Sequence, residues 1–179
     1  MDHRQADHLA RVRHLREAFS SQNEHLVGLL RQADHAIAER SEPGSWSAAQ
    51  VGWHVASVNT RFAAVIAGDV PAAKLLPDDF VERPWTDIAS ALPEKLEAST
   101  AAMPPAKVTS HDAIAALEAS AVKMARALDT LTDERGARTG VTNPIVGTIN
   151  LYQVGEWAAS HVGRHYSQAK RALEGEATV

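Results

Sequence analysis

Apolar side chains recur along much of the chain at intervals of three and four residues, which is the spacing of one face of an α-helix. The pattern predicts helical segments from about Asp7 to about Ala38, from Ser47 to Gly68, from about His111 to about Leu131, and from Asn150 to about Leu173. No repeat and no convincing strand accompanies them. The predicted fold class is therefore all-α, a four-helix bundle formed by residues 1–179 as a single domain.

Two of the predicted helices begin with a recognisable local signal. Ser47 is followed three residues later by Gln50, and Asn150 by Gln153. Both pairs fit the capping box, in which each side chain accepts a hydrogen bond from the backbone N–H of the other residue. Gly68 is expected to end the second helix, because glycine adopts the left-handed conformation that closes many helices.

The connection between the second and third predicted helices is long, covering about residues 69–109, and it is rich in proline. One short helix is expected within it, from about Asp87 to Ala101. The length of this connection indicates a topology other than four helices joined by short up-and-down hairpins. Phe80 and Trp85 either pack over the mouth of a site or attach the connection to the core. The next connection, residues 132–147, is polar and contains glycine.

The composition is typical of a soluble globular protein, with 45% hydrophobic and 22% charged residues. The net charge of -4 provides no basic surface for a nucleic acid or an anionic membrane. The most apolar stretch, residues 51–67, is interrupted by His54, Asn59 and Arg61 and is not expected to span a membrane. Because the first residues are too charged to begin a signal peptide, a cytoplasmic location is expected.

The chain contains no cysteine. This excludes disulfides, thiolate metal sites and a cysteine nucleophile. Any metal ion would have to be held by nitrogen and oxygen, and any thiol chemistry would need a thiol from outside the chain. The sequence contains no P-loop, no dinucleotide-binding glycine motif and no nucleophile elbow, and no pair of carboxylates marks a di-iron bundle.

Histidines are the candidate chemical groups. His161 and His165 are four residues apart on the last predicted helix, so both rings lie on one face, in line with buried residues. His54 lies at the edge of the apolar face of the second helix. Three histidine nitrogens and an open position form a known catalytic metal site. Spacing alone leaves open the alternative that these rings are only hydrogen-bonded at a partly buried face. Solvated positions are expected for the other histidines near the N-terminus: His3, His8, His14, His25 and His35.

Two blocks of the sequence combine a turn with nearby histidines. The first is Pro43-Gly44-Ser45-Trp46-Ser47, followed by His54-Val55. The second is Asn143-Pro144-Ile145-Val146-Gly147, followed by His161-Val162-Gly163-Arg164-His165 and Gln168. These blocks resemble the signatures of the DinB-like superfamily. They stand in the order found in that family and together span most of the chain. Val55 departs from the usual leucine, which is a conservative change.

The resemblance implies a four-helix bundle that binds one divalent metal ion through His54, His161 and His165. Zinc or nickel is expected first, and iron or manganese also suits such a site. Members of the family include thiol-dependent S-transferases and a thiol-dependent maleylpyruvate isomerase, which use low-molecular-weight thiols such as bacillithiol or mycothiol. Many other members are classed as metal-dependent hydrolases and have no known reaction.

Four further residues share the helix faces of the histidines and are candidates for supporting the metal or lining a substrate pocket: Gln50, Trp157, Arg164 and Gln168. The two glutamines lie within one turn of a histidine, where they are expected to hydrogen-bond its ring. Trp157 is expected in the core or in a pocket wall. Arg164 would meet an anionic substrate or solvent. For each glutamine, a simple packing or surface role is the alternative.

The sequence leaves three functions open. The first is a metal-dependent enzyme of the S-transferase or hydrolase type, which acts on a small molecule through a metal-activated thiol or water. The second is a non-catalytic metal- or ligand-binding bundle, retained as a stress or interaction protein. The third is a structural bundle with buried histidines. A homodimer is a further expectation, since helical bundles often pair through an apolar face.

Overall fold

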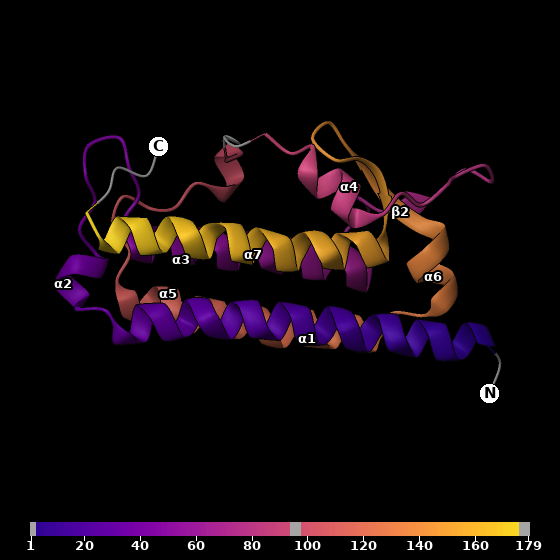
Figure 1. Cartoon of the computed structure of the whole chain (residues 1–179), viewed down its shortest axis with the longest axis horizontal. Helices are drawn as coiled ribbons and strands as arrows, with labels where there is room; N and C mark the ends of the chain where they lie inside the picture. The colour runs from indigo at the N-terminus through magenta and orange to yellow at the C-terminus, as the bar shows by residue number, and fades with distance from the viewer. Residues whose placement is uncertain (1–2, 94–97, 176–179) are drawn as a thin grey trace.

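The computed structural model of the chain describes residues 3–93 and 98–175. Its elements, in order, are α1 (His3–Gln32), α2 (His35–Ala38), α3 (Ala48–Ala67), β1 (Lys74–Leu75), α4 (Trp85–Ser90), the 3-10 turn η1 (Thr100–Ala102), α5 (Ser110–Asp129), α6 (Asp133–Arg138), β2 (Thr139–Asn143), β3 (Gly147–Asn150) and α7 (Leu151–Leu173). The long helices α1, α3, α5 and α7 pack as a bundle (Figure 1). The predicted all-α four-helix bundle is confirmed.

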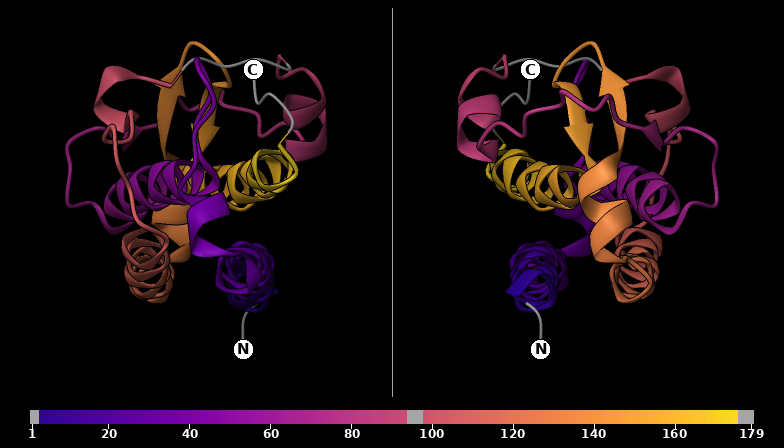
Figure 2. Two further views of the ribbon diagram at one scale, coloured as in Figure 1. Left: turned by 90° about the vertical axis from the view of Figure 1, so that its left-hand side faces the viewer. Right: turned by 90° about the vertical axis from the view of Figure 1, so that its right-hand side faces the viewer.

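The four long helices form two layers, with α3 and α7 side by side in one layer and α1 and α5 in the other (Figures 1 and 2). The consecutive helices α1 and α3 lie diagonally across the bundle from each other (Figure 2). The connections that leave α3 and α5 run over the face of the α3–α7 layer that points away from α1 and α5 (Figure 2). This arrangement leaves one face of α3 and α7 covered by connecting segments instead of by another long helix.

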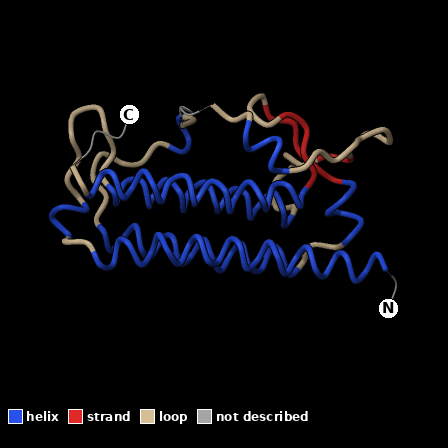
Figure 3. The backbone as a smooth tube through the Cα atoms, viewed as in Figure 1, coloured by secondary structure: helices blue, strands red, loops and turns tan. Residues whose placement is uncertain are grey.

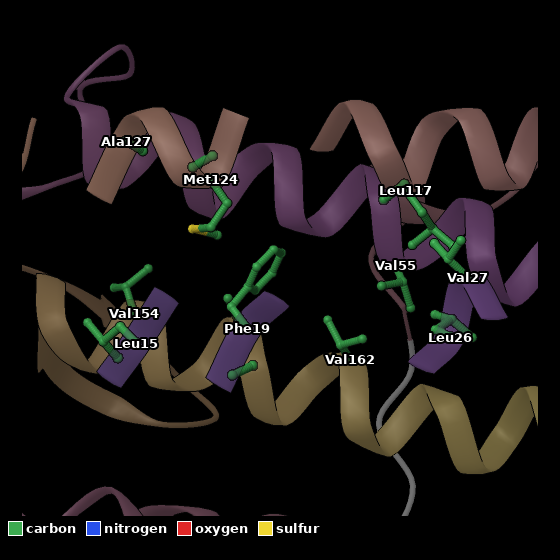
Figure 4. Packing of buried hydrophobic residues seen from close by; sticks show 14 of the residues in the cluster. Leu15, Phe19, Leu26, Val27, Val55, Leu117, Met124, Ala127, Val154 and Val162 are labelled. Atoms are coloured by element: carbon green, nitrogen blue, oxygen red, sulfur yellow. The ribbon is translucent and has the colours of Figure 1, made fainter. Parts of the chain in front are cut away.

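The hydrophobic core lies between the two layers. Buried apolar side chains from the four long helices meet there, among them Leu15, Phe19, Val55, Leu117, Met124 and Val162 (Figure 4). Each such side chain contributes roughly 1.5–3 kcal/mol when it is taken out of water. The helices therefore direct their periodic apolar positions toward one another. In the described part of the chain, no helix is long and apolar enough to cross a membrane.

The capping signals predicted from the sequence are confirmed. Ser47 Oγ accepts the N–H of Gln50 at 3.1 Å, and Gln50 Oε1 accepts the N–H of Ser47 at 2.9 Å. Asn150 and Gln153 exchange the same pair of bonds at 2.9 Å and 3.1 Å. Helix α3 ends at Gly68, whose φ of +86° lies in the left-handed region. The starts of the two helices that carry His54, His161 and His165 are thus fixed locally.

The first predicted segment is divided into two helices, which corrects the expectation of one segment reaching Ala38. Helix α1 runs without interruption from His3 and ends at Gln32. The carboxylate of Asp34 then accepts the N–H groups of Ala36 and Ile37 and starts α2. An aspartate that caps the following turn competes with continuation of the helix before it.

The prediction that the chain has no strand is wrong. Strands β1, β2 and β3 form an antiparallel sheet in that order, drawn in red in Figure 3. A loop of residues 144–146 joins β2 to β3, and Gly147 follows it with φ +76°. The strands contain two, five and four residues, too few for a clear alternation of apolar and polar positions. Gly140 is required in β2, because an added Cβ would lie 2.1 Å from the carbonyl oxygen of Ile149.

The connection from α3 to α5 also differs from its prediction. In place of one helix from Asp87 to Ala101, it contains α4 and the separate turn η1, and residues 94–97 lie outside the described part. Trp85 Nε1 donates to Ser160 Oγ at 2.7 Å, which attaches α4 to α7. Trp85 also packs against the core, so its role here is attachment of the connection.

One of the histidines expected in solvent is buried. His8 is only 7% exposed, and its Nδ1 lies 2.7 Å from the hydroxyl of Tyr152. That hydroxyl donates to Asp133 Oδ1 at 3.2 Å, and the guanidinium of Arg11 lies 4.0 Å from the centre of the tyrosine ring. The prediction for His8 is wrong because its partner comes from α7, at the other end of the chain. The remaining N-terminal histidines are exposed, as predicted: His3, His14, His25 and His35.

Candidate metal centre

Three histidines from two helices form one cluster. His54 is on α3, and His161 and His165 are one turn apart on α7. The ring centres are 5.3 Å apart for His54 and His161, 4.7 Å for His54 and His165, and 4.4 Å for His161 and His165. One nitrogen from each ring lies within 4.8 Å of the corresponding atoms of the other two. The fold thus brings together the three residues that the sequence singled out.

The ring of His54 is fixed by the connection that covers α3. Its Nδ1 donates to the carbonyl oxygen of Ala102, in η1, at 2.8 Å. A carbonyl oxygen can only accept, so the ring hydrogen is on Nδ1 and the lone pair is on Nε2. His54 is 4% exposed, and the ring of Trp46 lies 4.9 Å from its own. This tautomer leaves Nε2 as the atom that can bind a metal ion.

The ring of His165 is fixed in the same way from within its own helix. Its Nδ1 lies 2.6 Å from Oε1 of Gln168, one turn further along α7. With the amide oxygen as acceptor, the hydrogen is again on Nδ1 and the lone pair on Nε2. Gln168 therefore lies where the sequence placed a supporting residue for this histidine.

The ring of His161 has a different environment. Its Nδ1 is buried and has no hydrogen-bond partner among the residues that the structure describes. The ring of Phe62 meets it nearly edge-on at 6.2 Å, and Trp157 in turn lies 5.0 Å from Phe62. A buried polar atom without a partner costs about 1–3 kcal/mol. An unsatisfied imidazole nitrogen beside two rings with fixed tautomers is consistent with a position for a cation.

Burial keeps the cluster neutral. Burial is the main cause that lowers the pKa of His54, and it is also the main cause that lowers the pKa of His161 well below its ordinary value. For His165, burial and the neighbouring His54 lower the pKa to about 4, against a smaller opposing effect of the bond to Gln168. At neutral pH the three rings are therefore uncharged, which is the form that binds a metal ion.

The other predicted residues lie around the cluster. Gln50 is 8% exposed and donates from Nε2 to the carbonyl oxygens of Pro105 and Ala106, at 2.9 Å and 3.2 Å. Gln50 therefore holds the segment that follows η1. The ring of His54 is instead hydrogen-bonded to the carbonyl oxygen of Ala102. Arg164 donates from Nη1 to the carbonyl oxygen of Pro93 at 3.0 Å.

Sequence reasoning missed several residues of this site. The carbonyl oxygen of Ala102 left no signal, because any residue offers the same backbone group. The aromatic contacts of Trp46 and Phe62 depend on how α3 meets its neighbours. Arg61, which donates to the carbonyl oxygen of Ala101, could have been found from its position two turns after His54 on the same helix face.

The donor set fits a divalent metal ion of the zinc or nickel kind. Imidazole nitrogens suit these ions, and three of them are a common protein contribution to a catalytic site. The fold and the site together define a helical bundle with a buried three-histidine cluster suited to a divalent metal ion.

A comparison with known families agrees with this class. The chain belongs to the DinB superfamily, whose family profile matches residues 14–169. The matched range includes all three histidines. None of the curated proteins matches the chain.

Proposed function

We propose that the protein is a metal-dependent enzyme in which His54, His161 and His165 bind one divalent cation and which acts on a small molecule. The observation that carries the proposal is the fixed tautomer of two rings. Ala102 and Gln168 each hold a hydrogen on Nδ1, which leaves Nε2 of His54 and His165 as electron-pair donors. A merely structural pair of histidines would not need a ring nitrogen of each kept within 4.8 Å of a nitrogen of a third histidine.

The chemistry proposed is that of an S-transferase or a hydrolase. Three neutral ligands leave the full double charge on the ion, which makes a bound thiol or water acidic near neutral pH. The residues of the chain itself orient the ligands, and the rings of Trp46 and Phe62 pack against those of His54 and His161, with Trp157 behind Phe62. A low-molecular-weight thiol as co-substrate suits a protein that has no cysteine of its own.

Zinc or nickel is the metal proposed first, since both bind imidazole well, and iron or manganese is the alternative. The substrate proposed is a small molecule, and neither a nucleic acid nor a membrane is proposed as a partner. The cytoplasmic location and the homodimer stay predictions from the sequence.

Metal content is the measurement that tests the proposal. The protein, purified without a nickel column, should hold about one metal ion per chain by mass spectrometry. The variant His161→Ala should lose it. The matched control is His111→Ala, because the side chain of His111 is 90% exposed and its loss should leave the metal in place. Wild-type protein that stays empty after addition of zinc and nickel would contradict the proposal.

Catalysis is tested separately on the metal-loaded protein. Transfer of a low-molecular-weight thiol, or hydrolysis of an activated ester or amide, should appear in the wild type and be lost in His161→Ala. A protein that binds the metal but turns over none of these substrates would instead support the non-catalytic binding function.

A further inference from the structure

Two arginines lie near the histidine cluster, one on each of the helices that carry it. Arg61 lies on α3 seven residues after His54, which places both side chains on one face of the helix. Its guanidinium donates to the carbonyl oxygen of Ala101, and the adjacent carbonyl, of Ala102, accepts from His54. The guanidinium and the imidazole are thus bound to neighbouring peptide groups of the same segment.

A second guanidinium comes from the other helix of the site. Arg164 precedes His165 directly and follows His161 by three residues on α7. It donates to the carbonyl oxygen of Pro93 at 3.0 Å. Pro93 and Ala101 belong to the same connection between α3 and α5, so both arginines are bound to that connection.

The fold holds both arginines close to the rings. The carbonyl that accepts from Arg61 is one residue before the carbonyl that accepts from His54, and Arg164 adjoins His165 in α7. Neutral imidazoles do not offset the charge of a divalent ion, so the site would gather positive charge from three sources.

We propose that the site selects small organic molecules with a carboxylate or an equivalent anionic group, and that Arg61 and Arg164 determine this specificity. The inference rests on the proposed function, because the substrate would bind beside the metal ion. A guanidinium matches the geometry of a carboxylate, and the two arginines come from the two helices that carry the histidines. An uncharged analogue of the same shape would lose these attractions.

The test uses the cobalt-loaded protein and two thiols that differ only in charge, 3-mercaptopropionate and 3-mercaptopropionamide. Binding of sulfur to cobalt changes the visible absorption spectrum, so each dissociation constant can be measured without turnover. The quantity compared is the ratio of the two constants in each variant, because this cancels the intrinsic difference between the thiols.

The preference for the acid should be about tenfold smaller in the double variant Arg61→Gln/Arg164→Gln than in the wild type, since two exposed ion pairs together have about this effect. Each single variant should show part of the loss, and added salt should reduce the preference of the wild type. The control is Arg126→Gln, which removes an exposed arginine of α5 and should keep the wild-type ratio.

Equal ratios in the wild type and the double variant, with cobalt bound in both, would overturn the inference and leave the metal site intact. A wild type that takes up no cobalt would overturn the proposed function, and the inference with it. The ratio is measured on the full chain and therefore includes the charges of Glu94, Lys95 and Glu97.

Cobalt content and circular dichroism of each variant establish that the variant is folded and loaded with metal.

Discussion

The imidazole of His165 and the carboxamide of Gln168 are joined by a hydrogen bond of 2.6 Å, one turn apart on α7. The helix itself sets this pairing, because side chains three residues apart lie on one face. The bond fixes both the orientation of the ring and the position of its hydrogen. A supporting residue three positions after a histidine on a helix is therefore a signal that can be read from sequence.

Removal of this acceptor should weaken metal binding. In Gln168→Ala the His165 ring is free to turn and to move its hydrogen to Nε2, so the affinity for zinc should fall about 10–100-fold. The measurement is competition with a chromophoric chelator. Gln168→Glu, which keeps an acceptor at the same place, should retain most of the affinity. Equal affinities for the alanine variant and the wild type would show that the bond does not support the metal.

Acid should destabilise the metal-free protein through the same histidines. Burial lowers the pKa of all three, that of His165 to about 4, from an ordinary value of 6.5. Between these values the unfolded chain binds protons that the folded chain does not. Stability should therefore be retained above about pH 6.5 and fall as the pH drops, by about 1.4 kcal/mol per pH unit for each histidine that stays neutral.

Urea unfolding of the metal-free protein between about pH 7 and about pH 5 measures this slope. The variant His165→Gln lacks one of the three groups and should show a smaller slope. The control His111→Gln removes a histidine whose side chain is 90% exposed and should keep the slope of the wild type. An identical slope in all three proteins would contradict the assignment of the acid sensitivity to the cluster.

The parts of the structure that could be predicted are those with local causes. Ser47 with Gln50, and Asn150 with Gln153, signal the starts of α3 and α7 within three residues. The spacing of His161 and His165 places them together on any helix. These local signals predict the structure correctly because they do not depend on which distant segment packs against the helix.

The parts that could not be predicted depend on distant partners. Strand β1 has two residues and exists only because it pairs with Thr139 and Gly140. His8 is buried only because its ring is hydrogen-bonded to the hydroxyl of Tyr152. The bond from His54 uses the carbonyl of Ala102, a group that every residue carries. A pattern along the chain contains no information on any of these contacts.

Two glycines in helices should respond to alanine in opposite directions. An added Cβ at Gly136, in α6, would lie 2.3 Å from Cζ of Tyr152, whereas at Gly28, in α1, nothing lies within 4 Å. Gly136→Ala should cost about 1–3 kcal/mol of unfolding free energy, because the ring must move. Gly28→Ala should gain about 0.5–1 kcal/mol from the better helix propensity of alanine. Urea unfolding checks both, and a neutral Gly136→Ala would mean that Tyr152 is not packed on this glycine.

Glu156 should be a source of instability at neutral pH. Its Oε2 is buried and has no hydrogen-bond partner among the described residues. Burial raises its pKa, and Glu82 adds to the rise, while Arg11 and His14 oppose it. Since the pKa in the folded state lies above that in the unfolded state, the protonated group supports the fold below about pH 4.5, and this support is lost as the pH rises.

The variant Glu156→Gln keeps the shape of the side chain and removes its charge. At neutral pH it should be more stable than the wild type by about 1 kcal/mol, the cost of one poorly satisfied buried group. The difference should shrink as the pH falls toward about 4, because the wild-type carboxyl is then protonated in both states. Urea unfolding at both pH values measures it, with Glu134→Gln, at an exposed position of α6, as the control. A variant less stable than the wild type at neutral pH would show that the attraction of Arg11 for the carboxylate exceeds the cost of its burial.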